Sequence, residues 1–368
     1  MSTHRVDRFL KLTADRGASD LHLAAGRPPM MRISGELDAV RYRILDNDEV
    51  TALVKPMTRP NQWRRLEEHG ECDFAYEVAG VARFRVNLFR LHQGLAGAFR
   101  IIPSEVVTLD QLSLPDAVRK VATYRSGLIL VTGPTGAGKS TTLAAIVDLI
   151  NRTRAVNIIT VEDPIEFVHK NKRAVIHQRE VGSHTRSFAS AVHVALREDP
   201  DIILVGELRD AEVIETALRA ADAGLLVMGT LHTNSAGKTL DRMLSAFPAE
   251  RRDGISQTLA ASLRAVVAQQ LVRRIGGGRV AALEILFDCP ALTSAIRESQ
   301  TYKIPDIIRG GHSAGMLSMD DALRDFVSEE IIEPGSAIDK AINKEGMRTW
   351  LKRNDYAVPE DIELPPSS

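Results

Sequence analysis

The chain has 368 residues, enough for two domains, and its composition of 44% hydrophobic and 26% charged residues is that of an ordinary globular protein. Its formal net charge of −1 argues against a surface built to bind nucleic acid. Cys72 and Cys289 form no C-x-x-C pair, which argues against a disulfide framework or a structural zinc site. No signal peptide and no run near the ~20 apolar residues of a membrane span is found, so we expect a cytoplasmic protein without direct membrane insertion.

The first hundred residues predict a small α+β domain. Val6, Phe9 and Leu10 recur at helical spacing and predict a first helix. A helical stretch is expected at 48–69, and short β-type runs lie on both sides of it, at 20–23, 30–33, 74–78, 82–89 and 96–102. We assign residues 1–103 to this domain and 104–116 to a linker.

From about residue 117 the pattern alternates between strand and helix, which predicts an α/β domain with a mainly parallel sheet covered by helices. A helix at 211–223 is expected to end at Gly224. The expected strands lie at 128–131, 157–161, 202–205, 225–229, 267–275 and 279–286. We assign 117–289 to this domain, 290–355 to a helical C-terminal region, and 356–368 to a disordered tail.

The most informative motif follows the first strand of this sheet and fits the pattern G-x-x-x-x-G-K-[S/T]. Its glycines let backbone N–H groups curl around phosphate oxygens, and the helix that follows adds partial positive charge. We expect Lys139 to reach the β- and γ-phosphates of ATP and the Ser140 hydroxyl to ligate Mg²⁺. The predicted nucleotide-binding residues are Gly133, Pro134, Thr135, Gly136, Ala137, Gly138, Lys139, Ser140 and Thr141.

Hydrolysis also needs a carboxylate near the γ-phosphate, and two groups of carboxylates follow later strands. Glu162, Asp163 and Glu166 could bind Mg²⁺ through water, or they could form an acid-rich loop that caps a helix. Glu207 follows the apolar run 202–205 and is the best candidate for a general base; the alternative is an ordinary glutamate at a helix N-terminus. Gly206 precedes it, where a generic Walker B motif has aspartate, so Mg²⁺ is expected to depend more on Ser140 and water.

Two further sets of side chains are candidates for contact with the phosphates. His232 follows another strand, where it could donate to the γ-phosphate or sense its loss, or could be structural. Arg83, Arg85 and Arg100 lie on expected strands of the first domain. Each could stabilise the transferred phosphoryl group from a neighbouring subunit, or could belong to a solvated strand face.

The ordered motifs resemble the secretion and twitching motility ATPase superfamily, and within it most closely the type IV pilus retraction ATPases. The matching strings lie at 19–23, 80–87, 133–142, 159–169, 196–207, 229–233 and 275–282, within a resemblance that spans 7–332. The resemblance implies a homo-hexameric ring whose subunits have a PAS-like N-terminal domain and a RecA-like P-loop ATPase domain. It also implies that turnover depolymerises the pilus through an inner-membrane platform protein, at the cytoplasmic face of that membrane.

The resemblance also assigns roles. Glu207 becomes the Walker B glutamate, Glu162, Asp163 and Glu166 the Asp box, with Glu166 holding Mg²⁺ through water, and His232 part of the His box. The string at 295–298, Ala-Ile-Arg-Glu, matches a motif that the family needs for retraction rather than for hydrolysis.

One departure from the family leaves other functions open. Leu225 stands where the family usually has a second histidine, which puts one phosphate-side contact in question. The alternatives are an accessory paralogue that assembles on ATP with weak turnover and works beside another retraction ATPase, and a pilus assembly or type II secretion ATPase.

Overall fold

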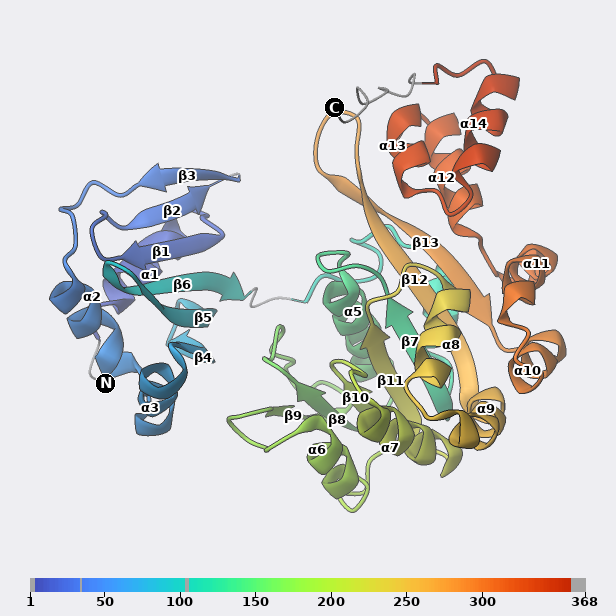
Figure 1. Ribbon diagram of the computed structural model, residues 1–368, viewed down its shortest axis with the longest axis horizontal. Helices are drawn as coiled ribbons and strands as arrows, with labels where there is room; N and C mark the ends of the chain where they lie inside the picture. Colours follow the sequence, from blue (N-terminus) through green and yellow to red (C-terminus); the bar gives the residue numbers. More distant parts are fainter. Residues whose placement is uncertain (1–3, 34, 103–105, 359–368) are drawn as a thin grey trace, which may run out of the picture. The chain divides into compact units, whose positions relative to one another are not determined.

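The computed structural model describes residues 4–33, 35–102 and 106–358, and it divides into two compact units (Figure 1). Unit 1 holds the residues up to 106 together with 163–169 and 180–184, and unit 2 holds the rest. The expected domain boundary at 103 and the first residues of the expected linker lie outside the described residues, as does the expected tail from residue 359 on.

Unit 1 is built on a six-stranded sheet with the order β3-β2-β1-β6-β5-β4, in which the paired neighbours are antiparallel. Its strands are β1 (Asp20–Ala24), β2 (Met30–Ile33), β3 (Glu36–Ala39), β4 (Glu71–Val78), β5 (Ala82–Leu91) and β6 (Gly94–Ile102). Its helices are α1 (Asp7–Asp15), α2 (Asn47–Val54) and α3 (Pro60–His69), with a 3₁₀ turn, η1, at Lys55–Met57.

The two faces of this sheet differ in chemistry. Phe84, Val86 and Leu88 alternate along β5 and are fully buried in the core of unit 1. Arg83 and Arg85 alternate with them and therefore lie on the opposite face. Arg100 is the register partner of Arg85 across β5 and β6. The three arginines predicted as site residues therefore share the outer face of this sheet.

Two sequence predictions for unit 1 need correction. The helical stretch expected at 48–69 is two α-helices joined by a 3₁₀ turn, because Pro56 and Pro60 lack the N–H that a continuous helix needs and favour helix starts. Strand β3 was not predicted, since its four residues are all exposed and show no apolar alternation.

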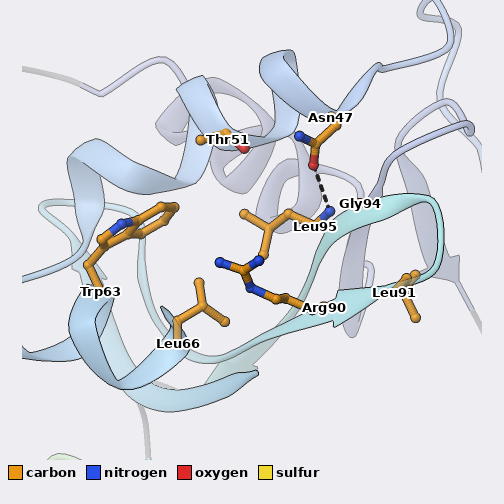
Figure 2. Close-up of a pocket in the computed structure, with 8 residues that line it drawn as sticks. All are labelled: Asn47, Thr51, Trp63, Leu66, Arg90, Leu91, Gly94 and Leu95. Carbon is orange, nitrogen blue, oxygen red and sulfur yellow. Dashed lines mark hydrogen bonds between the residues drawn. The ribbon is translucent and has the colours of Figure 1, made fainter. Parts of the chain in front are cut away.

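A pocket of about 330 Å³ lies beside the turn between β5 and β6 (Figure 2). The Asn47 side chain accepts a hydrogen bond from the Leu95 N–H at 2.9 Å, and a side chain at Gly94, whose φ is 131°, would overlap it. Figure 2 shows the Arg90 side chain extending across the pocket toward Trp63. None of the predicted site residues lines this pocket.

Unit 2 is built on a seven-stranded sheet with the order β13-β12-β7-β11-β10-β8-β9, which confirms the predicted α/β fold class. The pairs β12·β7, β7·β11, β11·β10 and β10·β8 are parallel, and β12·β13 is antiparallel. Its strands are β7 (Gly127–Thr132), β8 (Asn157–Glu162), β9 (Val175–Glu180), β10 (Ile202–Val205), β11 (Leu226–Leu231), β12 (Leu263–Arg273) and β13 (Arg279–Phe287).

Every residue of β7, β10 and β11 is buried, as expected for a parallel sheet with helices on both faces. The helices before the end of the sheet are α4 (Asp116–Val121), α5 (Lys139–Thr153), α6 (Phe188–Ala195), α7 (Ala211–Asp222), α8 (Ala236–Ser245) and α9 (Ala249–Ser262). Gly224, with a φ of 99°, follows α7 as predicted. Along the described residues, no helix is both long and apolar enough to cross a bilayer.

The C-terminal region is helical, as predicted, and part of it packs on the hairpin of β12 and β13. Val272 and Ala282 of the hairpin share a hydrophobic core with Met319, Leu323 and Ile338. The elements of this region are α10 (Pro290–Arg297), η2 (Thr301–Lys303), α11 (Ile304–Gly310), η3 (His312–Ala314), α12 (Met319–Ser328), α13 (Pro334–Lys340) and α14 (Lys344–Arg353).

One carboxylate is buried inside this packing. Glu284 of β13 is 5% exposed, and its Oε1 accepts a hydrogen bond from the Ala236 N–H at 2.6 Å. Burial raises the pKa of Glu284 to about 7, although the backbone N–H groups of Ala236 and Met319 favour its charged form; the nearby charge of Asp320 adds to the increase.

This shift predicts a stability that depends on pH. The folded pKa exceeds the ordinary value of 4.5, so the unfolded chain ionises first and the folded state loses stability as the pH rises from 4.5 through 7. The loss reaches about 3 kcal/mol above pH ~8. Glu284→Gln cannot ionise, so its free energy of unfolding should increase relative to wild type between pH 5 and pH 8 in urea titrations. An equal difference at both pH values would contradict the assignment.

Candidate active site

The predicted phosphate-binding loop joins the end of β7 to the start of α5. Gly138 adopts the left-handed conformation and forms the N-cap of α5, with a φ of 84°. Gly133 has a φ of 149°, and a Cβ atom there would overlap the carbonyl oxygen of Gln269. Glycine is therefore required at Gly133 because the loop lies directly against strand β12. Pro134, Thr135 and Gly136 are exposed at the top of the loop, and Ser140 and Thr141 stand in the first turn of α5.

The side chain of Gln269 in β12 holds this loop in place through two hydrogen bonds. Its side chain is 2% exposed, its Nε2 donates to the carbonyl oxygen of Ala137 at 2.7 Å, and its Oε1 accepts from the Thr142 hydroxyl at 2.7 Å. One amide therefore holds both the loop and the first turn of α5. The motif did not predict this residue; the available signal was a pair of glutamines inside an otherwise apolar strand.

Lys139 lies at the mouth of the loop and is 8% exposed. Its Nζ donates to the carbonyl oxygens of Gly133 at 2.9 Å and Pro134 at 3.1 Å. The same Nζ lies 3.5 Å from His232 Nδ1. The structure therefore brings two of the predicted site residues, Lys139 and His232, into contact.

Glu207 joins this group. Its Oε1 lies 3.1 Å from His232 Nε2, and its Oε2 lies 2.7 Å from Arg209 Nε. Glu207 and His232 follow the ends of β10 and β11, which are adjacent and parallel, so their side chains meet at one edge of the sheet. Lys139, His232, Glu207 and Arg209 therefore form a continuous line of polar contacts across the strand ends.

The glycine before Glu207 has a steric reason. The Gly206 N–H donates to the carbonyl oxygen of Val161 at 2.7 Å. A Cβ atom at Gly206 would lie 3.2 Å from that oxygen and 3.3 Å from the Cα atom of Glu162. A Walker B aspartate at this position would therefore require the backbone of strand β8 to shift by a few tenths of an ångström.

The three predicted carboxylates at and just beyond the end of β8 do not fall in one unit. Glu162 belongs to unit 2, where its Oε1 accepts from the Thr160 hydroxyl at 2.6 Å and from Gln178 Nε2 at 3.1 Å. Asp163 and Glu166 belong to unit 1. In the part of the chain that the structure describes, no group of three or more His, Cys, Asp or Glu side chains is arranged to hold a metal ion. Magnesium binding by Ser140 and Glu166 stays a prediction.

The three predicted arginines differ in their contacts within unit 1. Arg83 Nη2 lies 2.9 Å from Glu180 Oε2, and Arg100 Nε lies 2.8 Å from Asp20 Oδ1. Arg85 is exposed and has no ion pair with another described residue.

Leu225 lies far from His232. It precedes the first residue of β11, whereas His232 follows the last, and a rise of ~3.3 Å per residue separates them by about 20 Å. Within one chain, Leu225 therefore does not lie beside His232, and its effect on turnover stays an open question.

Comparison with known proteins places the chain in a family. Residues 3–288 match the family described as type II/IV secretion system protein. The chain belongs to this family. It is 47% identical over 336 residues to the type IV pilus retraction ATPase PilT of Pseudomonas aeruginosa, covering 91% of this chain and 98% of that protein. The predicted resemblance to pilus retraction ATPases is thereby confirmed.

Two further relatives agree with this assignment. The type IV pilus ATPase PilU of Pseudomonas aeruginosa is 34% identical, over 94% of this chain and 91% of that protein. A crystal structure of the pilus retraction motor PilT with bound ADP superposes with a TM-score of 0.87 at 40% identity, covering 94% of this chain and 99% of that one.

The contacts of Gln269 predict a selective effect on nucleotide binding. Gln269→Leu removes both hydrogen bonds under the loop and should weaken ADP binding about 10-fold, because an unmade bond to a buried group costs about 1–3 kcal/mol. Gln270→Leu is the matched control, since the neighbouring side chain donates instead to the carbonyl oxygen of Lys340 at 3.1 Å. It should lower the melting temperature without changing the Kd for ADP in titration calorimetry. Equal Kd changes for the two variants would contradict the role of Gln269.

Proposed function

We propose that this protein is an ATP-hydrolysing motor that powers type IV pilus retraction. The observation that carries the proposal is the meeting of Lys139, His232 and Glu207 at the mouth of the phosphate-binding loop. The 47% identity to a pilus retraction ATPase, over nearly its full length, supports the same function.

The site fits a nucleoside triphosphate with Mg²⁺. Strand β12 lies so close to Gly133 that only glycine fits there. The absence of a side chain lets the loop backbone close around phosphate oxygens. Lys139 supplies a cation at the mouth of the loop, and Ser140 supplies a hydroxyl for the metal. Mg²⁺, when bound with ATP, neutralises charge on the phosphate oxygens. Binding of ADP by the solved PilT motor supports nucleotide binding here.

The contacts of Glu207 fit the role of general base. Arg209 and His232 each hold one of its oxygens, which restricts the carboxylate to one orientation. In that orientation Glu207 would accept a proton from the attacking water, while His232, between Glu207 and Lys139, would respond to the γ-phosphate. His232 thus links the base to the lysine that binds the phosphate.

Arg85 is the arginine that we assign to action on a neighbouring subunit. Arg83 and Arg100 are already ion-paired with Glu180 and Asp20, whereas Arg85 is exposed on the same outer face. A guanidinium without an ion pair is available to stabilise the transferred phosphoryl group in a hexameric ring.

The proposed motor acts at the cytoplasmic face of the inner membrane, through a pilus platform protein. Arg297 and Glu298 of the predicted retraction motif are exposed at the end of α10, whereas Ala295 and Ile296 are buried beneath them. The two charged residues are therefore available to a partner. The 34% identity to PilU supports a paralogous retraction ATPase as a second partner.

The function is tested by phosphate release and pilus imaging with one set of variants. Glu207→Gln should lower kcat at least ~100-fold with ATP binding retained, and Lys139→Ala should weaken binding as well. Glu212→Gln, an exposed glutamate in the first turn of α7, is the matched control and should behave as wild type.

In cells, the same variants separate retraction from assembly. A deletion strain should be hyperpiliated and unable to twitch, and wild type or Glu212→Gln should restore twitching where Lys139→Ala does not. Loss of all surface pili on deletion would indicate an assembly motor instead, and a defect under some conditions only would indicate an accessory one.

The assignment of Arg85 predicts complementation between subunits. Arg85→Ala and Glu207→Gln should each be inactive alone, whereas a mixture should regain part of the wild-type turnover. The gain arises because one subunit supplies Glu207 and its neighbour supplies Arg85. Arg41→Ala, which removes another exposed arginine of unit 1, should stay active. A mixture no more active than the sum of its parts would refute the assignment.

A further inference from the structure

One row of residues crosses four strands of the sheet of unit 2, at the last residues of β7 and β11 and at interior positions of β12 and β13. Glu284 of β13 is in register with Ala268 of β12, which is in register with Thr132 of β7, which is in register with Leu231 of β11. Gly133 follows Thr132 and begins the phosphate-binding loop. His232 follows Leu231. The phosphate-binding loop and the loop that carries His232 therefore both begin at this row.

The first turn of α8 is bound to this row at two points. The Ala236 N–H donates to Glu284 Oε1 at 2.6 Å. The Thr239 hydroxyl lies 3.3 Å from the Thr132 hydroxyl and 2.7 Å from the carbonyl oxygen of Ser235, which also accepts from it. Between these points in the row stands Ala268, whose methyl group leaves room for the helix, and α8 contacts both β12 and β13. The N-terminus of α8 therefore lies against this row, with contacts to Thr132 of β7 and Glu284 of β13.

The loop that carries His232 depends on this attachment. Only residues 232–235 connect β11 to α8, and the Thr233 hydroxyl lies 2.7 Å from the Thr239 hydroxyl. The His232 side chain is 47% exposed. Its ring contacts Glu207 Oε1 and Lys139 Nζ, and both contacts depend on where the His232 backbone lies.

Glu284 is suited to this attachment by its chemistry. A carboxyl oxygen at the first residue of a helix accepts an N–H that the helix leaves unpaired, and negative charge there is favoured by the helix dipole. The N–H of Met319, the first residue of α12, also favours the charged form of Glu284. The same carboxyl group thus lies at the N-termini of two helices.

We propose that Glu284 is a positioning residue for ATP hydrolysis, which holds the first turn of α8 against this row of the sheet and so fixes His232 beside Lys139 and Glu207. Thr239 supports the same contact from the other end of the helix turn. The inference rests on the proposed hydrolysis of ATP. Glu284 itself touches neither nucleotide nor reacting atoms.

The test compares kcat and KM for ATP in the full-length protein. Glu284→Leu should lower kcat about 10- to 100-fold with KM within about 3-fold, because a small misplacement of a catalytic group costs rate rather than binding. Glu284→Gln keeps an acceptor for Ala236 and should restore kcat to within about 3-fold of wild type. Thr239→Val should lower kcat about 10-fold, and it carries the test if Glu284→Leu does not fold.

Asp148→Asn is the matched control for loss of a buried carboxylate. Asp148 is buried and ion-paired with Arg152 and Lys172, and it lies nine residues beyond Lys139 on α5. Asp148→Asn should lower the melting temperature and leave kcat unchanged.

The deciding measurement repeats the Glu284→Leu and Thr239→Val substitutions in a His232→Ala background. If they act through His232, their effect on kcat should shrink there to less than about 3-fold. The same fold-loss in both backgrounds, or an unchanged kcat in folded Glu284→Leu and Thr239→Val, would overturn the inference. If wild type itself releases no phosphate, the proposed function fails; if wild type turns over and Lys139→Ala does not, only the role of Glu284 is in question.

Discussion

The close approach of strand β12 to the phosphate-binding loop is the constraint on which the active site depends. The carbonyl oxygen of Gln269 lies where a side chain at Gly133 would be, and the Gln269 amide bonds Ala137 and Thr142. A flexible glycine loop gains a fixed shape only when such contacts replace the conformational freedom that its glycines allow. The parallel pairing of β12 with β7 sets this approach.

Parallel pairing also brings the reacting groups together. Because β7, β11 and β10 are neighbours that run in one direction, the residues that follow them gather at one edge of the sheet. Lys139, His232 and Glu207 meet there although they are distant in the sequence. The antiparallel strand β13 places Glu284 in register with the end of β7, and its side of the sheet packs against the C-terminal helices.

Local sequence signals predicted the side chains that meet at the strand ends. The glycine-rich motif, the apolar run before Glu207 and the strand before His232 each lie within a short window, so single-sequence patterns could find them. Gln269, Thr239 and Glu284 were not predicted, because their roles arise from contacts between segments that lie 48 to 132 residues apart in the sequence.

Other predictions failed or stayed open for equally physical reasons. Proline at positions 56 and 60 divides the expected helix at 48–69, which apolar periodicity alone did not reveal. Leu225 and His232 are close in sequence, but an extended strand places them at its opposite ends. The three carboxylates at the end of β8 lie within five residues of sequence, yet Glu162 belongs to one unit and Asp163 and Glu166 to the other.

The central claim is that Glu207 and His232 act together on one phosphate. A double-mutant cycle in single-turnover phosphate release, with Glu207→Gln, His232→Ala and the double variant, tests it most directly. The contact between the two side chains predicts that the double variant is little slower than Glu207→Gln alone. Losses that multiply, as for two independent sites, would contradict the account.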